Sequence, residues 1–441
     1  MNLLEELSRN EPSCLGQELY AFAASIYPIC RSITGDGIRA TLAAIQNRIP
    51  LNVSDIPSGT AVFDWTIPRE WNISDAYIKN AGGNRIVDFR EHNLHVVNYS
   101  TPVHAVMPLS KLRPHLFSLP AFPDRIPYRT TYYEENWGFC LSHRQLQSLE
   151  EGEYEVCIDS SLADGTLTYG EYYIPGNSSD EVLFSSHICH PSLANDNLSG
   201  IAIATFLAQF LSGRTLRYSY RFVFAPGTIG AISWLASNRD AAKRICNGLV
   251  LTCVGDEGPF HYKKSRRGNA QIDRAMARVL RDSGEEFTLL DFAPYGYDER
   301  QFCSPGFNLS VGCLMRSVWG TFPEYHTSAD DLSFIQPLAL AKSARICVAL
   351  VDSLESDVRY VRQNPYCEPQ LGRRNLYDSS GPDARTANLA RLWILNLSDG
   401  DYSLSDIAER SGLPFSAIQE AARTLRLAGL LSPVGASLHD D

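Results

Sequence analysis

The side chains best suited to chemistry begin in one string, residues 183–200, which reads LFSSHICHPSLANDNLSG. An apolar run ends in His187 and His190, a short polar loop follows, and Asp196 stands just before a helical pattern. The pattern predicts a buried strand that ends at imidazoles and leads to a helix start beside a carboxylate. Nitrogen and oxygen donors of this kind are ligands of zinc. The alternative is that Asp196 only caps the helix.

Two later apolar runs end in similar donors. LVLTCVGDEG supplies Asp256 and Glu257, and FPEYHTSADDL supplies Glu324 and His326. Ligands in α/β folds bind at the carboxyl ends of the strands, so donors that follow separate strands are expected to converge. The order His, Asp, Asp, His along the chain is more specific than any single donor. It predicts a metal site.

The elements that must position these donors alternate between strands and helices. From about residue 153, apolar strand-like runs are followed by helical patterns such as SGIAIATFLAQFLS. Further helices are predicted over 229–239, 272–282 and 337–354. This alternation predicts an α/β fold, with a mixed sheet flanked by helices on both faces.

Changes of pattern along the chain predict four parts. Residues 1–50 and 153–365 are expected to form the α/β domain, and the aromatic, Pro-punctuated residues 51–152 an inserted β-rich domain. Residues 366–384 are a Pro-, Gly- and Arg-rich connector. Residues 385–441 show three helical patterns and a short hairpin, and they resemble a winged helix.

Charge narrows the range of partners. Lys+Arg 39 against Asp+Glu 50 gives a net charge of −11, which disfavours phosphate backbones and anionic membranes. Residues 385–441 carry five Arg, no Lys and seven Asp and Glu, so 5 − 7 = −2, whereas a DNA-reading module is normally basic. We therefore expect no nucleic-acid partner. The winged helix or the inserted domain is expected to contact a protein or a second copy of the chain.

The cellular location follows from three features. The start, MNLLEELSRNEPS, has acidic residues where a secretory signal needs a basic start and an apolar run. The best uncharged apolar run, 201–211, is about half of the roughly 20 residues that a membrane span needs. The 11 cysteines are scattered without disulfide spacing. These features predict a cytoplasmic protein with reduced thiols and no membrane contact.

The motifs resemble those of a known family. The order His, Asn-Asp-Asn-x-Ser-Gly, Asp, Tyr-His-Thr-x-x-Asp is similar to that of the co-catalytic zinc aminopeptidases. Within them the chain resembles a bacterial aminopeptidase-like family, often found near polysaccharide or natural-product biosynthesis genes, with an inserted β-rich domain and a C-terminal winged helix. The resemblance covers almost the whole chain and includes CRSITGDGIRATL, CHPSLANDNLSG, ERQFCSPG, PEYHTSADDL and EPQLGRRNLY.

The resemblance implies one or two zinc ions. The ligands that it implies are Asp196, as the bridging carboxylate, His190 and Asp256 on one side, and His326 on the other. Against the usual His-x-Asp pattern of these peptidases, His187 takes the place of the ligand histidine and Cys189 that of the aspartate. The shorter loop favours His190, and both histidines stay candidates.

The chain departs from the family pattern at Gly227. The wider group carries a glutamate at this strand end, which serves as general base and metal ligand, and its loss removes the proton acceptor. Two alternatives to this glutamate stay open. Either Glu257 or Glu324 supplies the base, or one metal acts alone as Lewis acid and water activator. A thiol nucleophile at Cys189 with His190 as its base is disfavoured, because neighbours on a strand point to opposite faces.

Substrate recognition is predicted in the loop 295–301, YGYDERQ. An Asp-Glu pair can hold an ammonium group, and an Arg fork can hold a carboxylate. The alternative is an internal ion-pair network. The predicted substrate-binding residues are Tyr297, Asp298, Glu299 and Arg300.

These expectations lead to one principal hypothesis and two rivals. The first is a metal-dependent hydrolase of the aminopeptidase type, which cleaves an amide next to a free amino group of a small peptide or aminoacyl conjugate. The second is a metal-binding but catalytically silent homologue that recognises such ligands, and Gly227 supports it. The third, a transcriptional regulator, is disfavoured by the charge of the winged helix.

Overall fold

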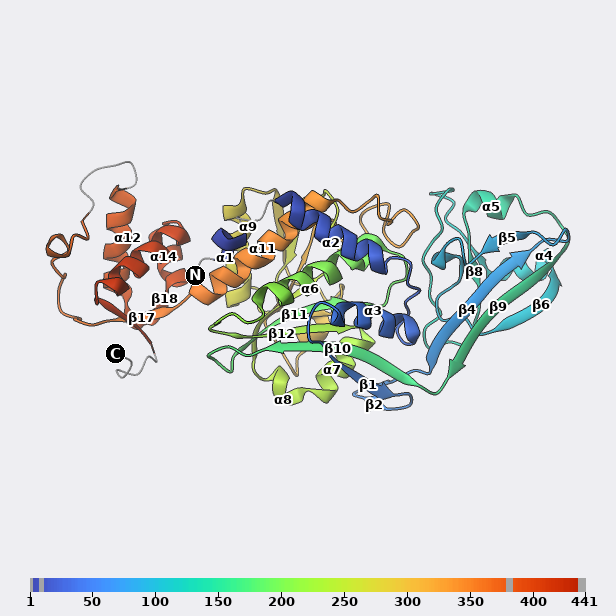
Figure 1. Cartoon of the computed structure of the whole chain (residues 1–441), viewed down its shortest axis with the longest axis horizontal. Helices are drawn as coiled ribbons and strands as arrows, with labels where there is room; N and C mark the ends of the chain where they lie inside the picture. The colour runs from blue at the N-terminus through green and yellow to red at the C-terminus, as the bar shows by residue number, and fades with distance from the viewer. Residues whose placement is uncertain (1–2, 8–11, 378–383, 435–441) are drawn as a thin grey trace. The chain divides into compact units, whose positions relative to one another are not determined.

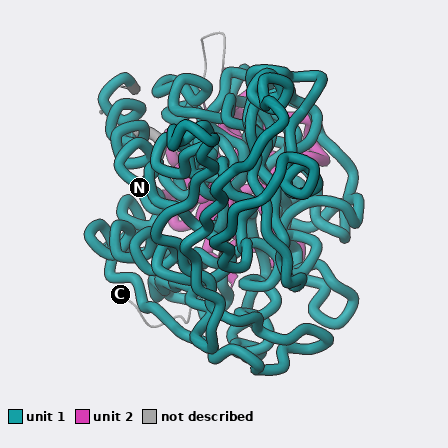
Figure 2. The backbone as a smooth tube through the Cα atoms, turned by 90° about the vertical axis from the view of Figure 1, so that its right-hand side faces the viewer, with its two compact units in different colours: residues 1–349 teal, residues 350–441 magenta. Residues whose placement is uncertain are grey.

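The computed structural model describes residues 3–7, 12–377 and 384–434. The chain divides into two compact units, residues 1–349 and 350–441 (Figure 2). Within the described residues, no helix combines the length and apolar character needed to cross a membrane.

An eight-stranded mixed sheet forms the centre of the first unit (Figure 1). In spatial order its strands are β1 Asn52–Pro57, β10 Thr166–Ile174, β12 Ser219–Ala225, β11 Glu181–His187, β13 Ile245–Leu251, β16 Val311–Met315, β14 Phe260–Lys263 and β15 Phe287–Leu290. The four central strands, β12, β11, β13 and β16, run parallel. They are buried almost throughout, as parallel strands covered on both faces must be.

The parallel direction of the central strands explains why distant donors meet. Their carboxyl ends lie at one edge of the sheet, which is where α/β folds bind ligands. His187 ends β11, and Gly227 follows the end of β12 after one residue. The loop that carries His326 follows β16.

Helices cover both faces of this sheet, as the sequence predicted. In Figure 1, α2 and α6 lie on one face, and α7 and α8 on the other. The predicted helices over 229–239, 272–282 and 337–354 appear as α7, α9 and α11. The helices of this part are α1 Leu3–Leu7, α2 Pro12–Ile26, α3 Asp36–Gln46, α6 Gly200–Leu211, α7 Ile229–Ser237, α8 Arg239–Ala242, α9 Gln271–Ser283, α10 Glu299–Phe302 and α11 Pro337–Ser356.

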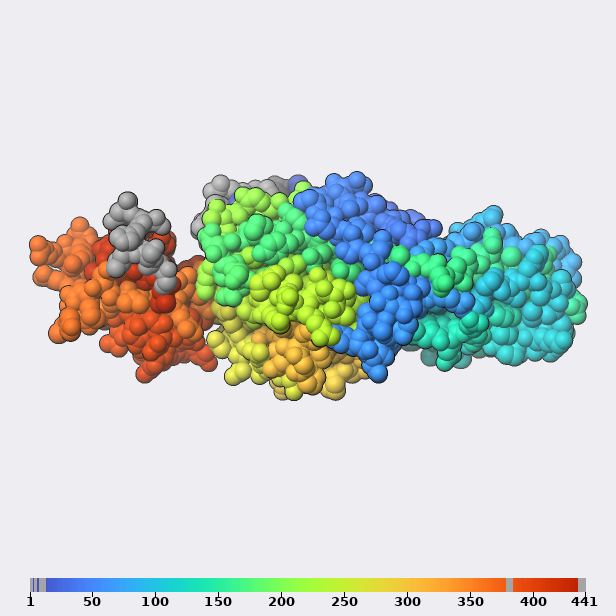
Figure 3. All heavy atoms as spheres, turned by 90° about the horizontal axis from the view of Figure 1, so that it is seen from below, coloured from blue at the N-terminus to red at the C-terminus, as the bar shows by residue number. Residues whose placement is uncertain are grey.

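A four-stranded antiparallel sheet is inserted between β1 and β10, and it forms a lobe of its own in Figure 3. Its strands are β5 Arg85–Asp88, β4 Glu70–Lys79, β9 Glu153–Ala163 and β6 Val103–Pro108. Smaller elements complete this lobe: the pair β7 Leu116–Phe117 with β8 Phe139–Cys140, and the helices α4 Leu109–Leu112 and α5 His143–Gln147. The short pair β2 Ala61–Val62 with β3 Trp65–Thr66 lies beside β1 instead, and β2 contacts α7 (Figure 1). The insert was expected to span residues 51–152. Strand β1, within those limits, pairs with the large sheet, and β9, beyond them, pairs with the sheet of the insert.

The second unit has a core of its own. Ile394, Ile418 and Leu425 are fully buried in it. Its three-stranded antiparallel sheet consists of β18 Asp399–Ser403, β17 Arg359–Arg362 and β19 Leu431–Pro433, and its helices are α12 Ala384–Leu397, α13 Leu404–Ser411 and α14 Phe415–Leu427. Three helices with a small sheet are the predicted winged-helix architecture. The α/β fold class with a C-terminal winged helix is thus confirmed.

Candidate metal centre

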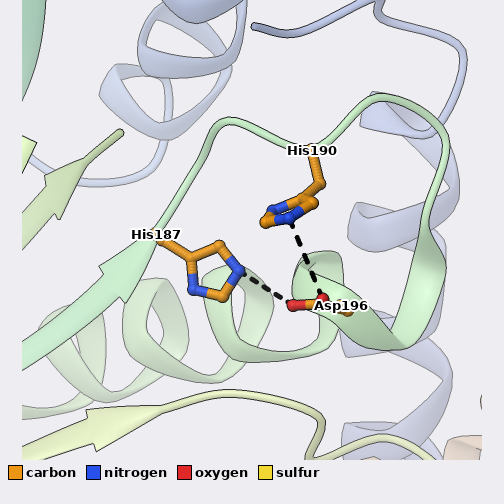
Figure 4. Close-up of side chains that lie close together, drawn as sticks. All are labelled: His187, His190 and Asp196. Carbon is orange, nitrogen blue, oxygen red and sulfur yellow. Dashed lines mark hydrogen bonds and ion pairs between the residues drawn. The ribbon is translucent and has the colours of Figure 1, made fainter. Parts of the chain in front are cut away.

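Three side chains that can bind a metal gather where β11 ends. His187 is the last residue of the strand, His190 follows after a short turn, and Asp196 lies in the helical segment η3 (Ala194–Ser199). One ligand atom from each side chain lies within 4.8 Å of the others (Figure 4). All three side chains are largely buried, so water competes little for these atoms.

The carboxylate of Asp196 is the centre of this cluster. His187 Nε2 lies 2.8 Å from Oδ1, His326 Nε2 lies 3.1 Å from Oδ2, and His190 Nε2 lies 3.9 Å from Oδ2. The hydroxyl of Tyr297 donates to Oδ2 at 2.5 Å. The structure thus brings together four of the five predicted ligands, with three histidines around the carboxylate of Asp196.

The loop that carries Asp196 is held by buried hydrogen bonds. The carboxylate of Asp330 accepts the backbone N–H of Asn195 at 2.6 Å and that of Asp196 at 3.0 Å. On the other side, the guanidinium of Arg31 donates to the backbone carbonyl of His190 at 2.8 Å. Contacts that orient ligands in this way support metal sites.

The protonation of two cluster residues suits a metal. Burial lowers the pKa of His190 well below its usual value, although Asp196 acts in the opposite direction. Burial by itself would raise the pKa of Asp196, but His190, His187 and His326 hold it well below its usual value. A neutral imidazole and an ionised carboxylate are the forms that bind cations. The cluster therefore fits a divalent metal that takes nitrogen and oxygen ligands.

Asp256 is not brought into the cluster. Its Oδ2 accepts the side-chain N–H of Asn195 at 2.7 Å, and its Oδ1 accepts the hydroxyl of Ser317 and the backbone N–H of Gly258, both at 2.7 Å. Among the described residues, His187, His190 and Asp196 form the group of potential ligands without it. Asp256 instead braces Asn195, the residue before Asp196.

The two predicted base glutamates lie in different surroundings. Glu257 is exposed. Glu324 is partly buried and forms an ion pair with Arg125 of the insert at 3.2 Å. Among the described residues, neither carboxylate forms a hydrogen bond or an ion pair with His187, His190, Asp196 or His326.

Gly227 lies beside the cluster. A Cβ built on it would be 3.4 Å from Cys189 Sγ and 3.7 Å from His187 Cβ, and its N–H donates to Cys189 Sγ at 3.2 Å. Burial raises the pKa of Cys189 to about 12, so the thiol is neutral at pH 7 and is a poor nucleophile. Gly227, after β12, and Cys189, after β11, thus lie beside the cluster at the two positions where the resemblance led us to expect carboxylates.

Two of the predicted substrate-binding residues lie close to the cluster. Tyr297 stacks on the ring of His187, with the ring centroids 4.5 Å apart. Asp298 is buried, and its Oδ1 accepts the N–H of Thr228 at 2.7 Å, directly after Gly227. Burial raises the pKa of Asp298 to about 6.

The other two predicted substrate-binding residues make internal contacts. Glu299 is fully buried in an ion pair with Lys263, at 2.7 Å, so Oε1 is already engaged. Arg300 approaches the hydroxyl of Thr228 at 3.5 Å. Glu299 therefore agrees with the alternative interpretation of this loop, in which its charged residues form internal ion pairs.

The insert reaches the cluster through Tyr128, which the sequence did not single out. Its ring centroid lies 5.1 Å from that of His190 and 5.0 Å from that of His326. Its backbone N–H donates to the carbonyl of His326 at 2.8 Å. The aromatic string IPYRTTYYEENW was visible in the sequence, but no spacing rule links it to residues almost 200 positions away.

Known proteins are similar to this chain in sequence and in fold. Residues 20–357 match the family described as "Domain of unknown function (DUF4910)", and residues 358–433 match a winged helix-turn-helix family. A Clostridium acetobutylicum protein named "Putative polysaccharide biosynthesis protein with aminopeptidase-like domain" is 49% identical over 435 residues, which cover 98% of this chain and 100% of that protein.

Solved structures extend the comparison. The crystal structure of a "putative peptidase" from Clostridium acetobutylicum has a TM-score of 0.92 at 49% identity, over 98% of this chain and 100% of that one. A zinc aminopeptidase from Bacillus subtilis has a TM-score of 0.56 at 12% identity, over 76% of this chain and 94% of that one, and at this identity it shows the fold alone. The chain therefore belongs to the DUF4910 family and combines a zinc-aminopeptidase fold with a C-terminal winged helix-turn-helix.

Proposed function

We propose that the protein is a metal-dependent hydrolase of the aminopeptidase type, which cleaves an amide bond of a small peptide or aminoacyl conjugate. The observation that carries the proposal is the Asp196 carboxylate, which three imidazoles from two distant segments approach at the carboxyl edge of a parallel sheet. A purely structural aspartate needs no such surroundings. The zinc-aminopeptidase fold supports the same reading.

The residues that would hold zinc, as one ion or two, are His187, His190, Asp196 and His326. When bound, the metal would act as a Lewis acid that polarises a carbonyl oxygen and makes a water molecule more acidic. The chain's own contribution is to hold the donors in place, and Asp330 and Arg31 do so through the backbone on either side of the cluster.

Asp298 is the carboxylate that we assign to proton transfer. It takes the place of the glutamate missing at Gly227, because it bonds to the N–H of the next residue, Thr228. Burial raises its pKa to about 6, near the pH at which a general base is most effective. Glu257 and Glu324, our expectations from the sequence, have no comparable contact with this strand end.

The fold and the name of one relative support the substrate class that we propose. Aminopeptidases act on amides next to a free amino group, and the name of the Clostridium acetobutylicum protein refers to polysaccharide biosynthesis. We propose an aminoacyl or peptidyl conjugate formed in polysaccharide or natural-product biosynthesis as the substrate.

A metal-binding but catalytically silent protein is the second candidate. The observation that favours it is Gly227, which leaves the cluster without a carboxylate at the end of β12. Such a protein would bind the same ligands without turning them over.

One experiment separates the two candidates. The purified full chain is analysed for zinc and then assayed on a panel of aminoacyl amides, with and without a chelator. A hydrolase gives turnover that the chelator abolishes and that added zinc restores. Asp196→Asn is expected to lose both zinc and turnover. Bound zinc without chelator-sensitive turnover would establish the silent binder, and absence of any bound metal would refute both.

A further inference from the structure

A short segment of the insert, residues 125–128, pairs with the loop that carries His326. The backbone N–H of Tyr128 donates to the carbonyl of His326, and that of Ser328 donates to the carbonyl of Ile126, both at 2.8 Å. The hydroxyl of Ser328 accepts the N–H of Ile126 in return, at 3.0 Å. The two segments run antiparallel along these bonds. We call residues 125–128 the strap.

Two side chains of the strap add contacts to the same loop. The guanidinium of Arg125 donates to the carbonyl of Pro323 and pairs with Glu324 at 3.2 Å, so it holds the part of the loop that precedes the histidine. The ring of Tyr128 meets that of His326 edge-on, with the ring centroids 5.0 Å apart. The strap therefore contacts both the backbone of the loop and the imidazole itself.

His326 needs such contacts more than the other predicted ligands do. His187, His190 and Asp196 are placed by the buried strand β11 and the buried segment η3, and their side chains are at most 11% exposed. The side chain of His326 is 32% exposed. Its backbone has φ 53°, a left-handed conformation that is uncommon outside glycine and persists only where the surrounding structure holds it.

The strap also packs against the segment that leads to Asp196. The small apolar cluster that it joins consists of Ile126, Tyr128, Leu94 and Leu193. Leu193 directly precedes η3, the segment that carries Asp196. One short piece of the insert thus contacts both loops, between which His326 Nε2 and Asp196 Oδ2 lie 3.1 Å apart.

We propose that the strap positions His326 for metal binding, so that the insert is part of the metal site although it supplies no predicted ligand. The proposal rests on the metal site of the proposed function and does not require hydrolysis. Arg125 and Tyr128 are positioning residues, because they act on the metal through His326. The three largely buried ligands would bind a metal without the strap, and the strap would add the fourth.

Competition with a chromophoric chelator measures the zinc affinity of the full chain and its variants. Arg125→Ala and Tyr128→Ala are each expected to weaken zinc binding about 10-fold, the usual lower value for loss of a group that orients a ligand. Tyr128→Phe keeps the ring and should keep the affinity. The matched control is Arg144→Ala, which removes another arginine of the insert, 69% exposed in a pair with Asp124, and should leave zinc binding unchanged. Circular dichroism checks that each variant folds.

The strap substitutions are then made in a chain that carries His326→Ala. There, Arg125→Ala and Tyr128→Ala should change the zinc affinity by no more than about 2-fold, because the residue through which they act is gone. The visible spectrum of bound Co²⁺, which reports the coordination geometry, gives a second readout. The spectra of the strap variants should depart from that of the wild type in the direction of His326→Ala.

Two results would overturn the proposal. One is an equal loss of zinc affinity with and without His326, which would show that the strap only supports the fold. The other is a wild-type affinity and Co²⁺ spectrum in both strap variants, and the spectrum decides if His326→Ala binds no metal at all. Turnover of aminoacyl amides enters neither readout. A strap effect without turnover supports the strap and removes the hydrolase, whereas chelator-sensitive turnover with inert strap variants does the reverse.

Discussion

At the scale of single residues, Asp298 is the group on which catalysis is expected to depend. The N–H of Thr228 fixes its carboxylate beside Gly227, and His187 is the neighbour that most lowers its pKa. Burial outweighs that effect and brings the pKa to about 6. At pH 7 the carboxylate is therefore mostly ionised, and it can accept a proton and release it again.

Asp298→Asn is expected to lower kcat on an aminoacyl amide by about 10²- to 10⁴-fold, the usual contribution of a general base. Zinc content should stay at the wild-type level, because Asp298 is outside the ligand cluster. The wild-type pH profile should lose activity as pH falls through about 6, when the carboxylate becomes protonated, and the variant should lack this limb. Steady-state kinetics between pH 5 and pH 8 measure both effects.

The control for this prediction is Glu257→Gln, which changes an exposed carboxylate and is expected to leave kcat close to the wild-type value. If Glu257→Gln lowered kcat and Asp298→Asn did not, the sequence-based assignment of the base to Glu257 would be the better one.

At the scale of elements, a partly buried ion pair is among the contacts that join the insert to the large-sheet domain. Glu70 at the start of β4 pairs with Arg39 of α3, with 2.5 Å between Oε1 and Nη2, and also accepts the N–H of Thr166 at the start of β10. Hydrogen bonding from Arg39 is the main cause that lowers the pKa of Glu70, from 4.5 to about 2. The ionised carboxylate of Glu70 therefore links helix α3 and strand β10 to strand β4.

Glu70→Gln is expected to lower the free energy of unfolding by about 1–2 kcal/mol at pH 7, a figure discounted for the partial exposure of Arg39. Because the pKa is depressed in the folded state, the stabilisation is complete above the unfolded value near 4.5 and is lost as pH falls toward 2. The difference between variant and wild type should thus shrink by more than half at pH 3. Urea unfolding at the two pH values measures it.

Glu18→Gln serves as the comparison, since Glu18 is 53% exposed in its pair with Arg48. We expect little change at either pH, as for most surface ion pairs. A Glu70→Gln effect that is the same at pH 7 and pH 3 would show that the ionised carboxylate is not the cause.

At the scale of the whole molecule, the metal cluster and the winged helix belong to separate units. All donors lie between residues 187 and 326, in the unit of residues 1–349, and the second unit buries its own apolar core. Metal binding should therefore not require the winged helix.

A chain that ends at residue 357 is expected to bind zinc with the stoichiometry and affinity of the full chain, as measured by equilibrium dialysis. Calorimetry of the full chain should show an additional unfolding transition that the shortened chain lacks, because the second unit has an independent core. Loss of zinc from a shortened chain that keeps its native circular dichroism would show that the winged helix supports the site.

The architecture could be predicted from the sequence because its signals are local. Helical periodicity over 337–354 and the apolar run before His187 mark a helix and a buried strand without any knowledge of their neighbours. The motifs around Asp196 and His326 carried the family resemblance, and the match to DUF4910 and to zinc aminopeptidases confirms the family and the fold. Convergence of the donors followed from the parallel direction of the strands.

By itself, the amino-acid sequence determined the fold class, the winged helix and the residue types available at the sheet edge. Only the tertiary structure decided that Asp196 lies among three histidines while Asp256 turns to Asn195, that Glu299 pairs with Lys263, and that Tyr128 packs on His326. These contacts join residues far apart in the chain, and their distances depend on how whole elements pack. Local periodicity reports which face of an element is buried, but it carries no information about the partner that covers it.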